Sequence, residues 1–141
     1  MNTLIQIPSL VESNITSYLS GVSGINYPVA QSFSVDDFTL PCVLVKAGKF
    51  SQMEPSIGVF EGNVAVSVIS QIDDVADTLN THDEVTSYVY DAMESGLADS
   101  FNSNGHLWNI YLDSIDQDKQ DRSLITILEY NATCQNLTLG D

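Results

Sequence analysis

The sequence predicts a single α+β domain: a mainly antiparallel sheet with an N-terminal helix and one central helix packed on a face. Three observations lead to this fold class. The length of 141 residues suits one ordinary domain. Strand-like segments are grouped along the chain instead of alternating with helices, which favours antiparallel pairing. Two other segments carry apolar residues at helical spacing.

The first helix is expected to open at Pro8 and to stop near Gly21. One face carries apolar side chains at helical spacing: Val11, Ile15, Tyr18 and Leu19. Ser9 followed by Glu12 fits a capping box, in which each side chain satisfies a backbone N–H. Residues 1–8 are predicted to form an arm, a strand or an extra helical turn.

Strands are expected from Asn26 onward. YPVAQSF is a short candidate, LPCVLVKAG a stronger one, and IGVFEGNVAVSVISQI the clearest, because its apolar residues alternate. GKFSQMEPS, between the last two, indicates a loop or the bent arm of a hairpin. Glu61–Gly62–Asn63 offers either a turn between two strands or a bulge within one long strand.

The central helix is predicted in THDEVTSYVYDAMESGL, after an irregular acidic connector, DDVADTLN. Thr81 as N-cap and Glu84 make a second capping box. The predicted buried stripe contains Val85, Tyr88, Val89, Ala92 and Met93. Gly96 suits the end of the helix. Tyr90 falls off this stripe, and an exposed aromatic side chain on a helix points to a protein–protein contact.

Two final strands are expected in HLWNIYLDS and RSLITILEY, joined by a polar connection that contains DSIDQDKQD. Core packing is the favoured role for Trp108 and Tyr111, as it is for Tyr88. The tail from 131 to 141 either extends the last strand or forms a flexible arm.

The chain is strongly acidic: it has 19 acidic and 4 basic residues, which gives a net charge of −15. The bases are Lys46, Lys49, Lys119 and Arg122. This balance argues against binding a nucleic-acid backbone or an anionic membrane. It is compatible with letting DNA pass without sticking, because an acidic wall repels phosphates.

Other sequence features point to no targeting signal. The N-terminal residues lack the basic and apolar regions of a signal peptide, and no stretch has the length of a transmembrane helix. Cys42 and Cys134 are therefore expected to be reduced, buried thiols.

The acidic stretch was weighed as a cation site. An EF-hand requires Gly at position six and Glu at position twelve. Neither is present, and Lys119 and Arg122 intrude among the aspartates Asp113, Asp116, Asp118 and Asp121. A solvated connection is therefore favoured, with a weak Ca²⁺ site and a functional acidic surface as the alternatives.

No catalytic or cofactor motif is recognised. His82 and His106 lack partners at metal-ligand spacing, and the cluster Asp73, Asp74 and Asp77 suits a solvated connector. There is no nucleophile elbow, phosphate loop or dinucleotide fingerprint. We expect neither an enzyme nor a cofactor.

The order of elements resembles a known group. An N-terminal helix, LPCVLVKAG, GVFEGNVAVSVIS, HDEVTSYVYDAMES and two closing strands are similar to the tail terminator (tail completion) proteins of long-tailed bacteriophages. The resemblance spans roughly residues 3–135 and rests on length and element order. It implies a homohexameric ring that caps the tail tube, ends its polymerisation and joins it to the head-side connector.

The same resemblance implies the partners and the location. The partners would be further copies of the chain, the tail tube protein and the neck protein, with DNA passing through the lumen unbound. The location would be the tail or neck of a virion assembled in the host cytoplasm. The alternatives are a head–tail connector or neck completion protein and, in another class, an acidic Ca²⁺- or ligand-binding module.

Within such a ring, the acidic stretch would project toward the lumen or a neighbour. Its candidate interface residues are Lys119, Arg122, Asp113, Asp116, Asp118 and Asp121, together with Tyr90. Because Lys119 and Arg122 are two of only four bases, a contact with an acidic neighbouring subunit is the sharper hypothesis.

Overall fold

The computed structural model confirms an α+β fold with two helices and a five-stranded, mostly antiparallel sheet. It describes residues 7–31, 41–52, 59–72, 75–95, 106–120 and 122–136. The elements are α1 (Ile7–Ser20), β1 (Val29–Gln31), β2 (Cys42–Gln52), β3 (Val59–Gln71), α2 (Val75–Ser95), β4 (His106–Gln120) and β5 (Ser123–Asn136).

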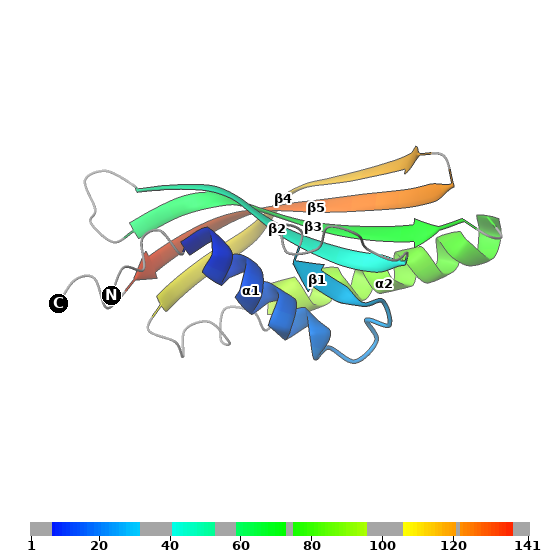
Figure 1. The fold of residues 1–141 in the computed structure, drawn as a ribbon, viewed down its shortest axis with the longest axis horizontal. Coiled ribbons are helices and arrows are strands. Elements are labelled where there is room, and N and C mark those ends of the chain that lie inside the picture. Colours follow the sequence, from blue (N-terminus) through cyan, green and yellow to red (C-terminus); the bar gives the residue numbers. More distant parts are fainter. Residues whose placement is uncertain are drawn as a thin grey trace.

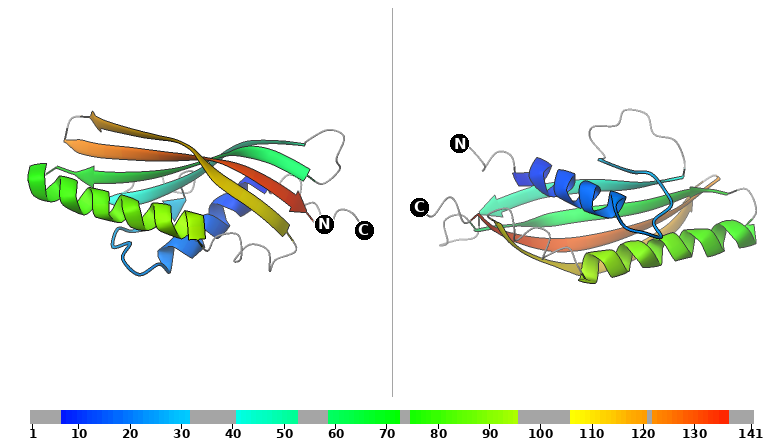
Figure 2. Two further views of the ribbon diagram at one scale, coloured as in Figure 1. Left: turned by 180° about the vertical axis from the view of Figure 1, so that it is seen from behind. Right: turned by 90° about the horizontal axis from the view of Figure 1, so that it is seen from below.

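The sheet has the order β1-β2-β3-β5-β4, and only β1 pairs in parallel with its neighbour. Both helices lie on the same face of the sheet, as the two views of Figure 2 show. Neither of the described helices lies on the opposite face (Figure 1). The core therefore lies in one layer, between the helices and one side of the sheet.

The predicted face of α1 is confirmed. Val11, Ile15 and Leu19 are fully buried, and Tyr18 packs at the margin of the core. The Ser9–Glu12 capping box is wrong, because α1 begins at Ile7 and so places Ser9 inside the helix. Glu12 turns instead toward the sheet, where it bonds to β2.

The β2–β3 pair is one long hairpin with a bulge. β3 runs without a turn through Glu61–Gly62–Asn63, so the turn considered there is excluded. The irregularity lies in β2, where Gly48 and Lys49 together occupy the place opposite Asn63. β2 continues to Gln52, so the segment from Gly48 is the bent arm of a hairpin.

Gly62 allows this bulge to form. A Cβ atom at Gly62 would come within 2.6 Å of both the Lys49 carbonyl oxygen and Cγ of Phe50. Gly24 has a comparable role in the turn before β1. Its φ of 102° is in the left-handed region, and a Cβ there would lie 2.8 Å from the ring of Tyr88.

α2 is longer than predicted, because it begins at Val75 and includes most of the expected connector. Thr81 therefore lies inside the helix, and the second capping box is also wrong. The sequence pattern missed the start because His82, a polar residue, occupies the buried stripe one turn before Val85. Tyr88 was expected in the core but is 40% exposed, resting on Gly24.

The end of α2 is held by α1. Tyr18 donates its hydroxyl hydrogen bond to the carbonyl of Ala92 across 3.1 Å. Ala92 is among the last four residues of the helix, whose carbonyls have no partner within it. This contact caps α2 and fixes the two helices relative to each other.

The acidic stretch is a strand and not a loop. β4 continues to Gln120 and pairs with β5 down to Gln120↔Ser123. The prediction of a long connection was wrong because every described side chain from 113 to 120 is exposed, so no apolar alternation marks the strand. Asp113 forms the irregularity between Leu112 and Ser114.

The tail was expected either to extend the last strand or to form a flexible arm. Residues 131–136 extend β5, so the first alternative holds for this part of the tail. Several predicted features lie outside what the structure describes. They are Gly96, the side chain of Trp108, the connector aspartates Asp73 and Asp74, and residues 1–6 and 137–141. Tyr111 was assigned to the core but is 52% exposed.

Candidate functional site

A chain of hydrogen-bonded polar side chains runs through the interior, with buried Ser70, His82 and Thr126 in the middle and less buried residues at both ends. Ser70 Oγ lies 2.7 Å from Nδ1 of His82, and Thr126 Oγ1 lies 2.7 Å from its Nε2. Tyr27 Oη extends the chain at one end, 2.6 Å from Ser70, and Gln117 Nε2 at the other, 2.9 Å from Thr126. We call these five residues the buried relay.

The buried relay joins α2 to two central strands. His82 comes from α2, Ser70 from β3 and Thr126 from β5. One hydrogen-bond direction fits all four contacts: Gln117 donates to Thr126, Thr126 to Nε2, Nδ1–H to Ser70, and Ser70 to Tyr27. The tautomer of this arrangement carries its proton on Nδ1.

The buried position of His82 and Ser70 determines whether they could act on a substrate. His82 is 0% and Ser70 1% exposed, so this hydroxyl–imidazole pair is closed to a substrate. Burial lowers the pKa of His82 from its ordinary value, although the nearby Asp83 charge acts in the opposite direction. A neutral imidazole with both nitrogens paired is a stable core element.

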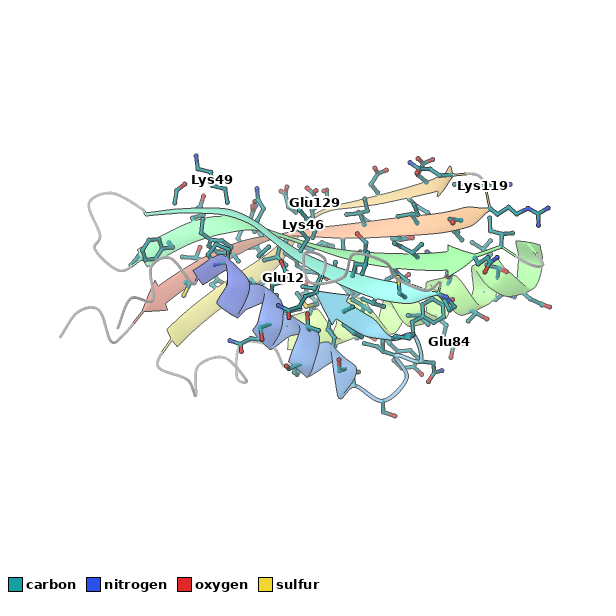
Figure 3. The ribbon with its side chains drawn as sticks, in the orientation of Figure 1. Glu12, Lys46, Lys49, Glu84, Lys119 and Glu129 are labelled. Atoms are coloured by element: carbon teal, nitrogen blue, oxygen red, sulfur yellow. The ribbon has the colours of Figure 1, made fainter. Side chains whose placement is uncertain are left out.

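A second buried polar contact closes the outer edge of β2. Glu12 Oε2 accepts a hydrogen bond from the backbone N–H of Ala47 across 3.0 Å. β1 pairs with β2 only as far as Val45, so this amide lies just beyond the last rung. Glu12 thus occupies the place where a longer β1 would have supplied a carbonyl (Figure 3).

Two buried oxygens have no hydrogen-bond partner among the described residues: Oε1 of Glu12 and Oη of Tyr130. Burial raises the pKa of the Tyr130 hydroxyl, and the charges of Glu94 and Tyr90 act in the same direction. Tyr130 therefore stays neutral in the folded protein. Neither oxygen lines a described hollow.

The helix-free face of the sheet, which we call the open face, has a shallow hollow of about 240 Å³. Lys46 and Glu129 stand on either side of Ala65 in one row across three strands. Both side chains are exposed, and both lie on the side of the sheet away from the helices (Figure 3). Gly48, Asn63 and Val64 complete the lining.

The predicted interface residues fall into two places. Asp116 and Asp118 lie on the open face of β4, opposite Ile127 and Ile125. Lys119 faces the helix side, where it lines a small hollow with Leu79 and Leu124. Arg122 is exposed at the β4–β5 turn; Asp121 lies outside the described residues.

Tyr90 is 38% exposed, which confirms that it lies off the buried stripe of α2. Tyr90 comes from α2, whereas the predicted aspartates Asp113, Asp116 and Asp118 come from β4, so the predicted residues lie on separate elements. The outward side of α2 carries carboxylates and no basic residue: Asp77, Asp83, Glu84, Asp91 and Glu94. Glu84 points away from the sheet in Figure 3.

Both cysteines are buried, and neither is in a disulfide bond, as predicted. Cys134 is in the core on β5, and burial raises the pKa of its thiol to about 12. Cys42 is on β2, where burial also raises its pKa. Both thiols are therefore protonated at neutral pH and poor nucleophiles.

Within the described ranges, no three His, Cys, Asp or Glu side chains gather as a cation site would require. None of the described helices combines the length and apolarity needed to cross a bilayer.

Comparison with known proteins gave no match, either to a family model or to a curated protein sequence. The surfaces described above therefore carry the functional argument.

Sequence reasoning did not select Lys46, Lys49 or Glu12 as candidate site residues. For the two lysines a signal was present, since they are half of the bases in the chain and lie three residues apart. Glu12 was assigned to a helix cap because the S-x-x-E spacing matched. Its position on the same face as Ile15 and Leu19 was the signal for burial.

Proposed function

We propose that this protein is a structural subunit of a phage tail or neck, one that assembles with further copies of itself into a ring around the DNA channel. The tail terminator role is the form of this proposal that the resemblance favours. The ring would cap the tail tube and present its other side to the head-side connector.

One structural observation carries the proposal: β4 is a long strand at the edge of the sheet, where another chain could bind. Among the described strands it pairs with β5 alone, and its side chains are exposed from Asp113 to Gln120. Tyr111 and Ile115 are more than half exposed on opposite faces of this strand. An unpaired strand with exposed apolar and aromatic groups is a template for a neighbouring chain.

The fold and charge agree with this role. The α+β architecture and the element order are those that the resemblance implies. The surface is dominated by carboxylates, so a channel lined by this protein would repel DNA phosphates instead of binding them.

The decisive experiment is electron microscopy of the purified protein, combined with light scattering over a range of concentrations. Closed annular particles of uniform mass are expected. In parallel, a phage lacking this protein should produce tails of uncontrolled length, or tails that do not join heads. A strict monomer at high concentration, together with uniform joined tails in the mutant phage, would contradict the proposal.

A head–tail connector or neck completion protein is the neighbouring reading, and the position of the protein in a virion map separates the two. Density at the end of the tail tube supports the terminator role. Density against the head-side portal supports the connector role.

A further inference from the structure

The sheet has two unequal outer edges. β1 covers β2 only between Val43 and Val45, so residues 46–52 of β2 have no outer strand among the described residues. On the far side of the sheet, β4 has no outer strand along its described length. One molecule therefore offers two different free edges at opposite sides of one sheet (Figure 1).

The strand directions make these edges compatible. β2, β3, β5 and β4 alternate in direction, so β4 runs opposite to β2. A second copy, placed beside the first by rotation about an axis along the strands, brings its β2 next to β4 in antiparallel orientation. The open faces of both copies then lie on the same side, which is a head-to-tail contact able to close into a ring.

The charges along these edges match in spacing. Lys46 lies opposite Ala65, and the bulge places Gly48 and Lys49 together opposite Asn63. The two lysines, three residues apart in sequence, are thus only two positions apart along the sheet. Asp118 and Asp116, opposite Ile125 and Ile127, are also two positions apart. All four charged side chains are exposed on the open face.

The same register pairs apolar side chains on the helix face. With Lys46 opposite Asp118 and the bulge opposite Asp116, Phe50 lies opposite Ile115. Phe50 packs at the margin of the core, whereas Ile115 is 59% exposed on its own molecule. The contact would cover Ile115 with an apolar neighbour, which an isolated molecule does not provide.

The edge of β2 is not free along its whole length. Glu12 already holds the amide of Ala47, and Gln31 of β1 occupies the outer side of Val45, which would face Lys119 in this register. The neighbour's β4 must therefore turn away from β2 after Asp118. Backbone bonds to a neighbouring strand are therefore expected after the bulge, from Phe50 to Gln52. The charge pairs would set the register of the contact more than its strength.

We propose that a second copy of this chain binds along β4 through residues 46–52 of its own β2, with Lys46 against Asp118, Lys49 against Asp116 and Phe50 against Ile115. This inference rests on the proposed ring and names the contact that builds it. It also assigns the acidic stretch a partner: the two exposed lysines of the next subunit.

Cysteine cross-linking tests the register directly. Ser51 and Ser114 are exposed and face each other in the proposed pairing, and opposite residues in antiparallel strands lie within disulfide reach, roughly 4.4–6.8 Å between Cα atoms. An equimolar mixture of the Ser51→Cys and Ser114→Cys variants should form the mixed disulfide dimer under mild oxidation. Each variant alone should form little. Asn63→Cys, exposed on the inner strand β3, is the control partner and should not cross-link with Ser114→Cys.

Charge reversal tests the pairing. Lys46→Glu with Lys49→Glu should abolish rings, as should Asp116→Lys with Asp118→Lys, and the four changes together should restore them. Asp83→Lys with Glu94→Lys, an equal charge change on α2, should leave rings intact. Rings that persist through both reversals, without the mixed disulfide, overturn this contact and leave the ring itself standing. A wild-type protein that never forms rings overturns the proposed function.

Discussion

Nε2 of His82 lies 2.7 Å from Oγ1 of Thr126, so a helix and a central strand are joined through the interior by a side-chain hydrogen bond. Neither residue is accessible to solvent to any useful extent, since the exposed fractions are 0% and 2%. Water therefore cannot replace either partner, and loss of one leaves the other unsatisfied.

Replacing Thr126 with Val should destabilise the protein markedly. The shape is kept, but Nε2 of His82 and the Gln117 amide lose their shared partner. We expect the free energy of unfolding to fall by about 1–3 kcal/mol, measured by urea denaturation. Thr126→Ser keeps the hydroxyl and should cost at most about 1 kcal/mol for the lost methyl group. Equal losses in the two variants would show that the hydroxyl does not matter.

Stability should depend on pH through His82. Burial lowers its folded pKa below the ordinary value of 6.5, so between these values the unfolded chain binds more protons than the folded one. The free energy of unfolding therefore rises with pH in this window. The contribution is complete above about pH 6.5 and is lost as the pH falls toward the folded pKa.

His82→Gln provides the control for this pH dependence, because glutamine does not titrate. Denaturation curves from about pH 7 to about pH 5 should show a steeper loss of stability in the wild type than in the variant. Parallel losses would mean that the carboxylates, and not His82, set the pH dependence.

Glu12→Leu should open the edge of β2. The leucine side chain stays buried between α1 and the sheet but leaves the Ala47 amide without an acceptor. We expect a loss of about 1–3 kcal/mol and faster hydrogen exchange at the Ala47 amide, followed by NMR. Glu12→Gln retains a carbonyl acceptor of the same shape, so its Ala47 exchange should stay slow. Unchanged exchange in the leucine variant would contradict the capping role.

Gly62→Ala should strain the bulge. The new methyl group would lie 2.6 Å from the Lys49 carbonyl oxygen and from the Phe50 ring. Overpacking of this kind costs about 1–3 kcal/mol, visible as a lower thermal midpoint. Gly21→Ala is the matched control, because its nearest contact is 3.6 Å. A tolerated Gly62→Ala would show that the bulge can shift without penalty.

Neither cysteine should react with a thiol reagent while the protein is folded. Both are buried, and the pKa of Cys134 is about 12, so almost no thiolate is present at neutral pH. Ellman's reagent should detect both thiols promptly in denaturant and neither in buffer. Rapid reaction of one thiol in buffer would indicate local opening of its strand.

The fold class was predictable because the strongest patterns are those of elements with one buried face. The alternation in β3 and the spacing of Val11, Ile15 and Leu19 both follow from such a face. β4 was missed beyond Asp113 because an outer strand exposed on both faces needs no apolar alternation.

The hydrogen bonds of the buried relay could not be predicted from the sequence for a different reason. His82, Ser70 and Thr126 are far apart in the chain and meet only when α2 docks on the sheet. Both capping boxes failed because the S/T-x-x-E spacing also occurs inside helices, where tertiary contacts decide what the glutamate binds. The equal spacing of the two lysines of β2 and the two aspartates of β4 could not be seen in the sequence, because it depends on a bulge that only the β2–β3 pairing reveals.

The position of β5 in the sheet affects how the chain folds during synthesis. β5 pairs with both β3 and β4, yet it is the last of the strands to be made. The β2–β3 hairpin can form early. The other edge of β3 stays unpaired until α2, β4 and β5 have left the ribosome. Joining β3 to β5 closes a loop that contains all of α2, which makes it the slow, non-local step of folding. Until that step, the emerging chain exposes the unpaired side of β3, which favours aggregation.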